Sequence, residues 1–584
     1  MLHLRRTLAL ILAHLALASA ALAEIPPALD RVPADAFAVV AAENLAALDE
    51  NTAQLLAAVE IDTISTFSQA LGAMGLRDGL NLKGSAAGVF YPANEKDAPP
   101  DLVLLLPVSD YGALMATLKA RREGESDRFD YAGQTYFARA VDGGYAVAGA
   151  SRTLVEGFTA APGNLPGHLG AMGARGRQIA TGADIVALAD TAQARALLAG
   201  VLGPLAQNAP GFGALAADPG ADPRLSIVGA ILARVESEGA RAVIGLTTGP
   251  LGLRMDLATQ FREASFMHAA CSSPPRPLPD LPALPRGDFV FLGSMHPTHP
   301  GLRAVIDEAL RPRPQAPAPA SDLARGILSA VREMDDATVV VYTPQNFFMG
   351  ALARSVVTWR SAKPALGAQA FRQWLASLDG QPVGTTKVST SFQDFAFRVN
   401  DTPVSAWSIA ADGGALGPSA VLLYANAAGP HGFISVGAER GWLTWSRDQD
   451  LLTGAMNAAA GEGSLASDIM LQQVRELLPG PRAIEWAINA RPILAQAASF
   501  AGQKTELPEL LPPIGAGVVM ADGAMHTTLF VPSPLIKSAF TIMNAVGAAP
   551  PRERPPERPA ERPAERPPER PPAHPPAQTE RRPR

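Results

Sequence analysis

Two histidines three residues apart, His296 and His299, are the most plausible metal ligands in this sequence. On a helix, this spacing would place both imidazoles on one face, where they could hold a transition metal. Pro297 between them and Pro300 after them argue against a helix, and no Asp, Glu or Cys lies within a turn to complete a ligand set. We therefore expect loop histidines and no metal site.

The only cysteine, Cys271, follows His268 by three positions and raises the question of a reactive thiol. A catalytic cysteine needs an electropositive pocket and a base that a third group orients. The neighbouring residues offer no such third group. We therefore expect an unreactive cysteine at a domain boundary, and a single cysteine excludes an intramolecular disulfide.

Two pairs of carboxylates, Asp448 with Asp450 and Asp335 with Asp336, have the residue type for acid–base catalysis. The first pair precedes a helical pattern at Leu451 and the second follows one, so helix capping and solvation explain them better. The sequence contains no P-loop, no Gly-x-Ser-x-Gly elbow, no His-Glu-x-x-His and no EF-hand loop. We predict no catalytic residue and no cofactor; a hydrolase site assembled only in space stays open as an alternative.

Tryptophan is distributed unevenly, because all six residues of this type lie in the second half of the chain: Trp359, Trp374, Trp407, Trp442, Trp445 and Trp486. If Trp442 and Trp445 lie on one strand, their indoles point to opposite faces, so one of them can face outward. An outward indole is a good anchor for a sugar ring, a lipid or a peptide. We predict Trp442, Trp445 and Trp407 as binding residues; the alternative is that they fill a core.

The second half of the chain repeats patterns of the first half. Residues 32–40 are echoed by residues 284–292, each a proline turn with an aspartate followed by an apolar run that starts at a phenylalanine. Residues 144–150 are echoed by 432–438, which share a glycine-aromatic start and a Gly-Ala end. A period this long indicates one duplicated domain and not a solenoid of short repeats.

Helical and strand patterns mix in each half. Short alternating runs joined by tight turns favour antiparallel strands, and Asp522-Gly523 is a strong hairpin signal. Asn44 is positioned to cap a helix, and amphipathic helices are expected over 111–119 and 369–378. The predicted fold class is α+β, with two tandem duplicated domains, each a curved antiparallel sheet packed with helices, followed by a disordered proline-rich tail.

The chain divides into five segments by composition. Arg5 and Arg6, an apolar stretch and the small residues Ala21-Leu22-Ala23 are typical of a signal peptide. After residue 547, Glu-Arg pairs recur every four residues between prolines, which forbids a continuing helix. The predicted segments are a signal peptide over 1–23, a first α+β domain over 25–270, a proline-rich linker over 271–287, a second α+β domain counted from 278 to 545, and a disordered tail over 548–584.

The net charge and the signal-like segment limit the kinds of partner that we expect and where we expect the protein to be located. The chain has 49 basic and 55 acidic residues and a net charge of −6. Nucleic-acid binding needs clustered positive charge, so we expect no nucleic-acid partner. No segment after the signal has about 20 uninterrupted apolar residues, so no transmembrane span is expected in the mature chain. The expected location is periplasmic or secreted.

The opening Pro-Ala-Asp-Ala-Phe-Ala-Val-Val at residues 33–40, its second copy, and the hairpin pattern at 517–532 resemble an uncharacterised family of secreted bacterial proteins. The resemblance implies a duplicated α+β domain without an assigned activity, and it carries no catalytic residue to this chain. We therefore expect an exported, non-catalytic binding or scaffolding protein of the bacterial envelope, whose partner is an envelope protein, a lipid or a glycan. The alternatives are a periplasmic carrier of an apolar ligand such as lipid, and the hydrolase mentioned above.

Overall fold

The computed structural model describes most of the chain. The expected signal peptide and the expected tail lie outside the described residues. The described residues are 24–62, 66–73, 78–92, 101–131, 133–191, 234–274, 281, 284–309, 330–344, 350–383, 386–411, 429–458, 464–500 and 507–547.

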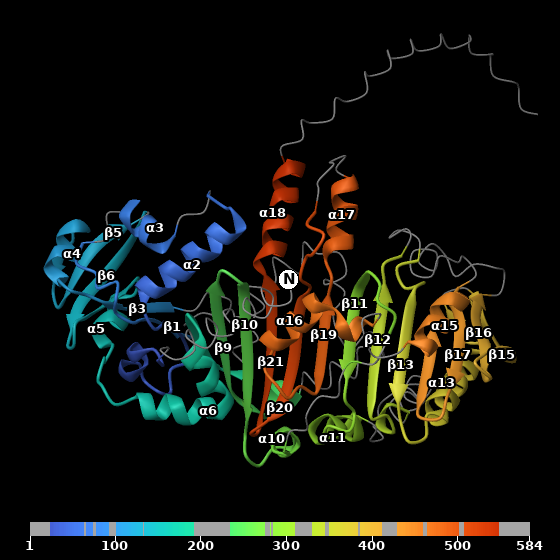
Figure 1. Cartoon of the computed structure of the whole chain (residues 1–584). Helices are drawn as coiled ribbons and strands as arrows, with labels where there is room; N and C mark the ends of the chain where they lie inside the picture. The colour runs from blue at the N-terminus through green and yellow to red at the C-terminus, as the bar shows by residue number, and fades with distance from the viewer. Residues whose placement is uncertain are drawn as a thin grey trace, which may run out of the picture.

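The first half contributes ten described strands, all paired antiparallel, as expected for short alternating runs joined by tight turns (Figure 1). In chain order they are β1 (Ala38–Ala42), β2 (Ala86–Tyr91), β3 (Asp101–Pro107), β4 (Arg121–Glu123), β5 (Ser126–Tyr131), β6 (Gln134–Val141), β7 (Tyr145–Gly149), β8 (Ile185–Asp190), β9 (Gly239–Gly249) and β10 (Gly252–Phe261). Neighbouring strands in space run in the order β4-β5-β6-β7-β3-β2-β1-β8-β9-β10.

The second half contributes the remaining described strands: β11 (Phe289–Met295), β12 (Asp336–Tyr342), β13 (Ser355–Arg360), β14 (Pro382–Val383), β15 (Thr386–Val399), β16 (Thr402–Ala411), β17 (His431–Val436), β18 (Arg440–Thr444), β19 (Ile484–Ile488), β20 (Ile514–Ala521) and β21 (Ala524–Pro532). Their order in space is β21-β20-β19-β11-β12-β13-β18-β17-β16-β15, and β14 forms a short hairpin with the start of β15. Counted outward from β10 and from β21, corresponding strands follow the same chain order in the two halves, with β14 as an addition.

One strand pair joins the two halves into a single sheet. β10 pairs antiparallel with β21 from Gly252 opposite Pro532 to Gln260 opposite Ala524. Each of these strands ends a hairpin, β9–β10 and β20–β21, so each would otherwise leave an unpaired edge. The expected Asp522-Gly523 turn is present, and both residues have positive φ. Pairing of β10 with β21 satisfies the backbone hydrogen-bonding groups of both edges and joins the two halves into one continuous sheet.

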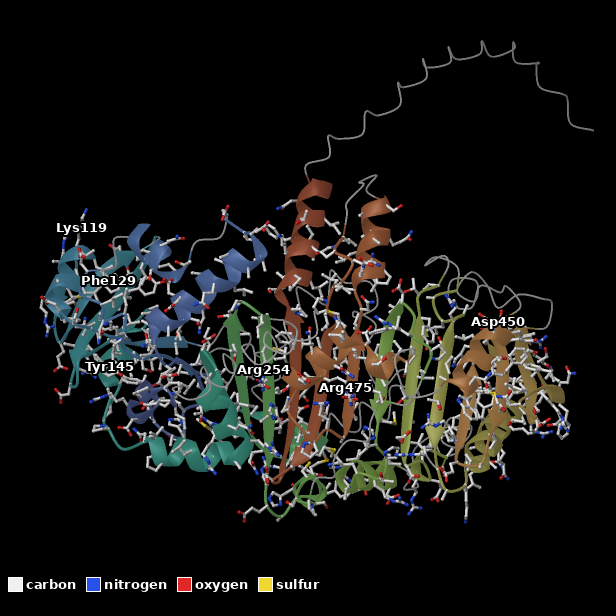
Figure 2. All side chains as sticks on the ribbon, in the orientation of Figure 1. Lys119, Phe129, Tyr145, Arg254, Asp450 and Arg475 are labelled. Carbon is white, nitrogen blue, oxygen red and sulfur yellow. The ribbon has the colours of Figure 1, made fainter. Side chains whose placement is uncertain are left out.

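The described helices cover both faces of the sheet (Figures 1 and 2). In the first half they are η1 (Pro27–Arg31), α2 (Leu45–Val59), α3 (Phe67–Ala73), α4 (Tyr111–Thr117), α5 (Arg152–Gly157), α6 (Leu165–Gly182) and α10 (Phe266–Cys271). In the second half they are α11 (Pro300–Ala309), α13 (Ala365–Leu378), α15 (Gln449–Asn457), η2 (Leu465–Ser467), α16 (Ile469–Leu477), α17 (Arg491–Phe500) and α18 (Ser533–Gly547). The predicted α+β class with an antiparallel sheet is confirmed.

Helices of the first half contact helices of the second half near the β10–β21 pair. Figure 1 shows α10 beside α11, and α18 also contacts α2. An apolar cluster at the boundary contains Phe261 and Met267 from the first half, and Val305 and Met520 from the second. The two expected domains therefore share a strand pair and part of a core. None of the described helices has the length and apolarity needed to cross a membrane.

Candidate functional site: an apolar pocket beneath α13

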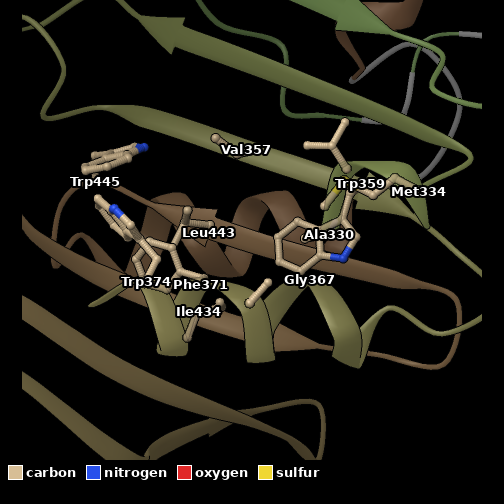
Figure 3. Close-up of a pocket in the computed structure, with 12 residues that line it drawn as sticks. Ala330, Met334, Val357, Trp359, Gly367, Phe371, Trp374, Ile434, Leu443 and Trp445 are labelled. Carbon is tan, nitrogen blue, oxygen red and sulfur yellow. The ribbon is translucent and has the colours of Figure 1, made fainter. Parts of the chain in front are cut away.

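A pocket of about 280 Å³ lies between α13 and the sheet of the second half (Figure 3). Its floor comes from β13, β17 and β18, and residues before β12 close one end. None of the described residues that line it carries a charge. The lining residues are Ala330, Val331, Met334, Val357, Trp359, Gly367, Ala370, Phe371, Trp374, Ile434, Leu443 and Trp445.

The sequence of α13 explains how this helix covers the sheet. Phe371, Trp374, Leu375 and Leu378 recur at spacings of three and four residues, which places them on one helical face. All four belong to the apolar cluster between α13 and the sheet. Arg372, on another face of the helix, is paired with Asp394 at 3.2 Å. The amphipathic helix therefore directs two aromatic rings at the pocket and keeps its charge outside.

Trp359 forms a fixed wall of the pocket. Its indole Nε1 donates a hydrogen bond of 3.0 Å to the carbonyl oxygen of Pro364, just before α13 begins. A Cβ on Gly367 would lie 2.7 Å from that same nitrogen, and a Cβ on Gly441 would overlap the ring. The two glycines provide the space that the indole occupies, and the hydrogen bond holds the ring in place.

An aromatic cluster supports the opposite end. The rings of Trp407 and Trp445 meet edge to face, with centroids 5.1 Å apart at 88°. Phe371 contacts Trp407 at 5.1 Å and Trp374 at 5.2 Å. These tilted and edge-on contacts are the arrangements that aromatic quadrupoles favour. Aromatic rings from α13, β16 and the end of β18 thus hold one another in position around the pocket.

The three tryptophans predicted as binding residues have different positions. Trp445 lines the pocket, as Figure 3 shows. Trp407 is fully buried behind it, so this indole supports the pocket and does not face outward. Trp442 is half-buried and packs against other clusters, those around Val340 and Phe433.

Sequence reasoning did not select Trp359, Trp374 or Phe371, which line the pocket. For Phe371 and Trp374 a signal was present, because the two aromatic residues are three positions apart within a predicted amphipathic helix. For Trp359 the decisive neighbours are Gly367 and Gly441, and only the fold shows their proximity to the indole.

In the first half, the space beneath α4, which corresponds to the space beneath α13, is filled by different side chains. There α4 spans seven residues, whereas α13 spans 14. Leu114 and Met115 of α4 pack against the small side chains of Ala138 and Ala148. The first half contains no tryptophan. The tryptophans are therefore specific to the helix-covered sheet of the second half.

A buried polar group at the β10–β21 pair has the residue types of a catalytic triad. Asp256 Oδ1 lies 2.9 Å from His526 Nε2 and accepts a 2.5 Å hydrogen bond from Thr528. Burial alone would raise the pKa of Asp256, but the bonds from His526, Arg254 and Thr528 outweigh it and hold this pKa below its usual value.

The geometry of this group is not that of a hydrolase. In a triad, one imidazole nitrogen contacts the acid and the other contacts the nucleophile. Here Asp256 and Thr528 both lie near Nε2 of His526, at 2.9 and 3.2 Å, and Nδ1 has no hydrogen-bond partner among the described residues. All three side chains are buried. The arrangement fits a polar link between the two halves.

His296 and His299 lie in the turn between β11 and α11, and both are buried. The Nδ1 atom of His299 accepts a hydrogen bond from the backbone of Gly301. Burial lowers the pKa of His296 to about 4, so its imidazole is neutral at neutral pH. Within the described ranges no three His, Cys, Asp or Glu side chains are grouped so that they could hold a metal ion.

The structure also shows what surrounds the remaining candidates from the sequence, Cys271 and the paired aspartates. Burial raises the pKa of the Cys271 thiol to about 12, which disfavours the reactive thiolate. Asp448 caps α15 by accepting a hydrogen bond from the backbone of Leu451, as expected. For Asp336 the expectation of a solvated helix end is wrong. This residue begins β12 and is buried in an ion pair of 2.8 Å with Arg360, because its side chain faces the covered side of the sheet.

Comparisons with family models, with characterised proteins and with solved structures find no match to this chain.

Proposed function

We propose that the chain is an exported, non-catalytic binding protein of the bacterial envelope that holds an apolar ligand beneath α13. The observation that carries this proposal is the pocket of about 280 Å³, whose described lining residues are all apolar. Ligand sites in proteins are concave, mostly apolar and few. Export is supported by the signal-like residues 1–23.

The lining distinguishes among the partner classes expected from the sequence. A glycan would need hydrogen-bonding side chains around its hydroxyl groups, because a buried hydroxyl without a partner is costly. Among the residues that the structure describes, no Asp, Glu, Asn, Gln or Arg lines the pocket. An apolar molecule loses no such bonds, so the lining favours a carrier of an apolar ligand over a glycan-binding protein.

The proposal includes a duplicated architecture. Two observations support descent of both halves from one α+β domain. The strand order counted outward from β10 matches the order counted outward from β21. The sequence of residues 32–40 is echoed by residues 284–292. On this view the first half retains the small-residue packing beneath α4. The second half acquired a longer helix and tryptophans, and with them a binding site.

Titration calorimetry with two neutral apolar compounds, naphthalene and 1-octanol, tests the binding function on the full chain. We expect at least one of them to bind with a negative heat-capacity change, the signature of apolar burial. Ala370→Leu places extra methyl groups in the pocket and should weaken binding at least tenfold. Ala376→Leu makes the same substitution at an exposed position of α13 outside the lining and should leave binding unchanged.

Two results would refute the function. One is that neither compound binds the unmodified chain. The other is that Ala370→Leu, shown to be folded by circular dichroism, binds as tightly as the unmodified chain, because the ligand would then lie elsewhere.

A further inference from the structure

We infer that the ligand beneath α13 is a neutral, flat ring system of about the size of naphthalene or indole, and not an acyl chain. This inference rests on the proposed function and narrows it to one chemical class. Three features of the pocket carry it: its volume, the type and placement of its walls, and the absence of charge among the lining residues that the structure describes.

The volume sets the size of the ligand. The pocket measures about 280 Å³. An apolar cavity of about 150 Å³ holds one benzene ring, so by proportion this pocket holds roughly ten to eleven non-hydrogen atoms. Two fused rings have this size. A lipid with two acyl chains is several times larger, so the pocket could enclose only a small part of it.

The walls favour a ring over a chain of equal size. Indoles of Trp359, Trp374 and Trp445 face the pocket from three different elements, and Phe371 adds a fourth ring. In Figure 3 Trp445, Trp374 and Phe371 lie at one end and Trp359 at the other. Aromatic ligands gain offset-stacked and edge-to-face contacts with such rings, contacts that an alkyl chain lacks.

The walls are also preformed. Trp359 is held by its hydrogen bond to Pro364 and by the space above Gly367 and Gly441. A flat, rigid ligand loses little conformational freedom on entering a fixed pocket, whereas a flexible chain must be ordered. Rigidity of the wall therefore adds to the preference for a ring.

The lining excludes a charged ligand. None of the twelve lining residues within the described part of the chain carries a charge. A carboxylate or ammonium group placed among them would lose its hydration without gaining an ionic partner. The ligand is therefore neutral in the part that enters the pocket.

Titration calorimetry on the full chain with naphthalene, 1-naphthoate and 1-octanol tests each part of the inference. We expect naphthalene to bind at least tenfold more tightly than 1-octanol, and 1-naphthoate at least tenfold more weakly than naphthalene. The first comparison reports on ring against chain. The second reports on charge at constant ring size.

Substitutions at Trp374 connect the preference to the pocket. Trp374→Leu keeps an apolar side chain but removes the ring, so naphthalene should bind several-fold more weakly while binding of 1-octanol changes little. Trp374→Phe restores a ring and should recover most of the affinity for naphthalene. Trp486→Leu, on β19 and outside the lining, is the matched control and should leave both affinities unchanged.

The outcomes separate this inference from the function on which it rests. If 1-octanol binds as tightly as naphthalene or more tightly, the ring preference is wrong and apolar binding stands. If 1-naphthoate matches naphthalene, the requirement for a neutral ligand is wrong. If none of the three compounds binds, both the function and its refinement fail.

Discussion

Trp359 shows how single residues set the shape of the pocket. Its indole occupies space that exists only because residues 367 and 441 are glycines. The same ring donates its one polar hydrogen to Pro364, so a buried donor is satisfied. A wall that is both sterically confined and hydrogen-bonded gives the pocket a defined shape before any ligand enters.

Gly441→Ala should destabilise the fold by roughly 1–3 kcal/mol, because the added methyl group overlaps the Trp359 ring in a packed core. Chemical denaturation monitored by tryptophan fluorescence measures the loss. Gly170→Ala in α6, where a Cβ meets no atom within 4 Å, is the control and should be neutral or slightly stabilising. Equal effects of the two substitutions would show that Trp359 is not confined as described.

His296 should make stability depend on pH. Burial lowers its pKa from 6.5 to about 4, so between these values the unfolded chain binds a proton that the folded chain does not. Protonation of His296 in the unfolded chain therefore lowers the free energy of unfolding as the pH falls from 6.5 to about 4, by at most about 1.4 kcal/mol per pH unit. Denaturation at several pH values should show a smaller loss for His296→Gln. Parallel curves for the two proteins would contradict the buried neutral imidazole.

The β10–β21 pair is the element that most affects the architecture. Nine residue pairs join these strands, and the buried Asp256, His526 and Thr528 hydrogen-bond across them. Gly252 begins β10 with φ of +144°, a conformation that side-chain-bearing residues rarely adopt. A Cβ there would overlap the backbone of Val531 on the partner strand.

Gly252→Ala should therefore weaken the join by roughly 2–4 kcal/mol, through both backbone strain and the overlap with β21. Hydrogen exchange should show faster exchange of the β10 and β21 amides, and the melting temperature should fall. Gly249→Ala lies in the same hairpin, where a Cβ meets no atom within 4 Å, and should have little effect. Unchanged exchange in Gly252→Ala would mean that this strand pair does not form in solution.

At the scale of the whole molecule, the shared sheet and boundary core should make the halves unfold together. All six tryptophans lie in the second half, so their fluorescence reports on that half, whereas far-ultraviolet circular dichroism reports on both. We expect the two signals to give the same denaturation midpoint, because β10–β21 pairing and the cluster around Phe261 and Met520 couple the halves. Two separate midpoints would indicate independent domains.

Several local features of the fold follow from sequence pattern alone. Asn44 and Asp448 cap helices where predicted, because a side-chain oxygen before an amphipathic run satisfies free backbone amides. The Asp522-Gly523 hairpin forms because both residues tolerate positive φ. The α+β class follows from alternating and helical periodicities, which are properties of neighbouring residues.

The sequence by itself also determined that tryptophan is confined to the second half and that no common catalytic motif is present. Only the tertiary structure decided which indoles share a pocket, because Trp359, Trp374 and Trp445 come from elements that meet through sheet pairing and helix packing. It also decided that Trp407 is buried, that Asp336 lies inside an ion pair, and that β10 and β21 join the halves. Each of these facts depends on contacts between residues far apart in the chain, and periodicity within a short segment carries no information about such contacts.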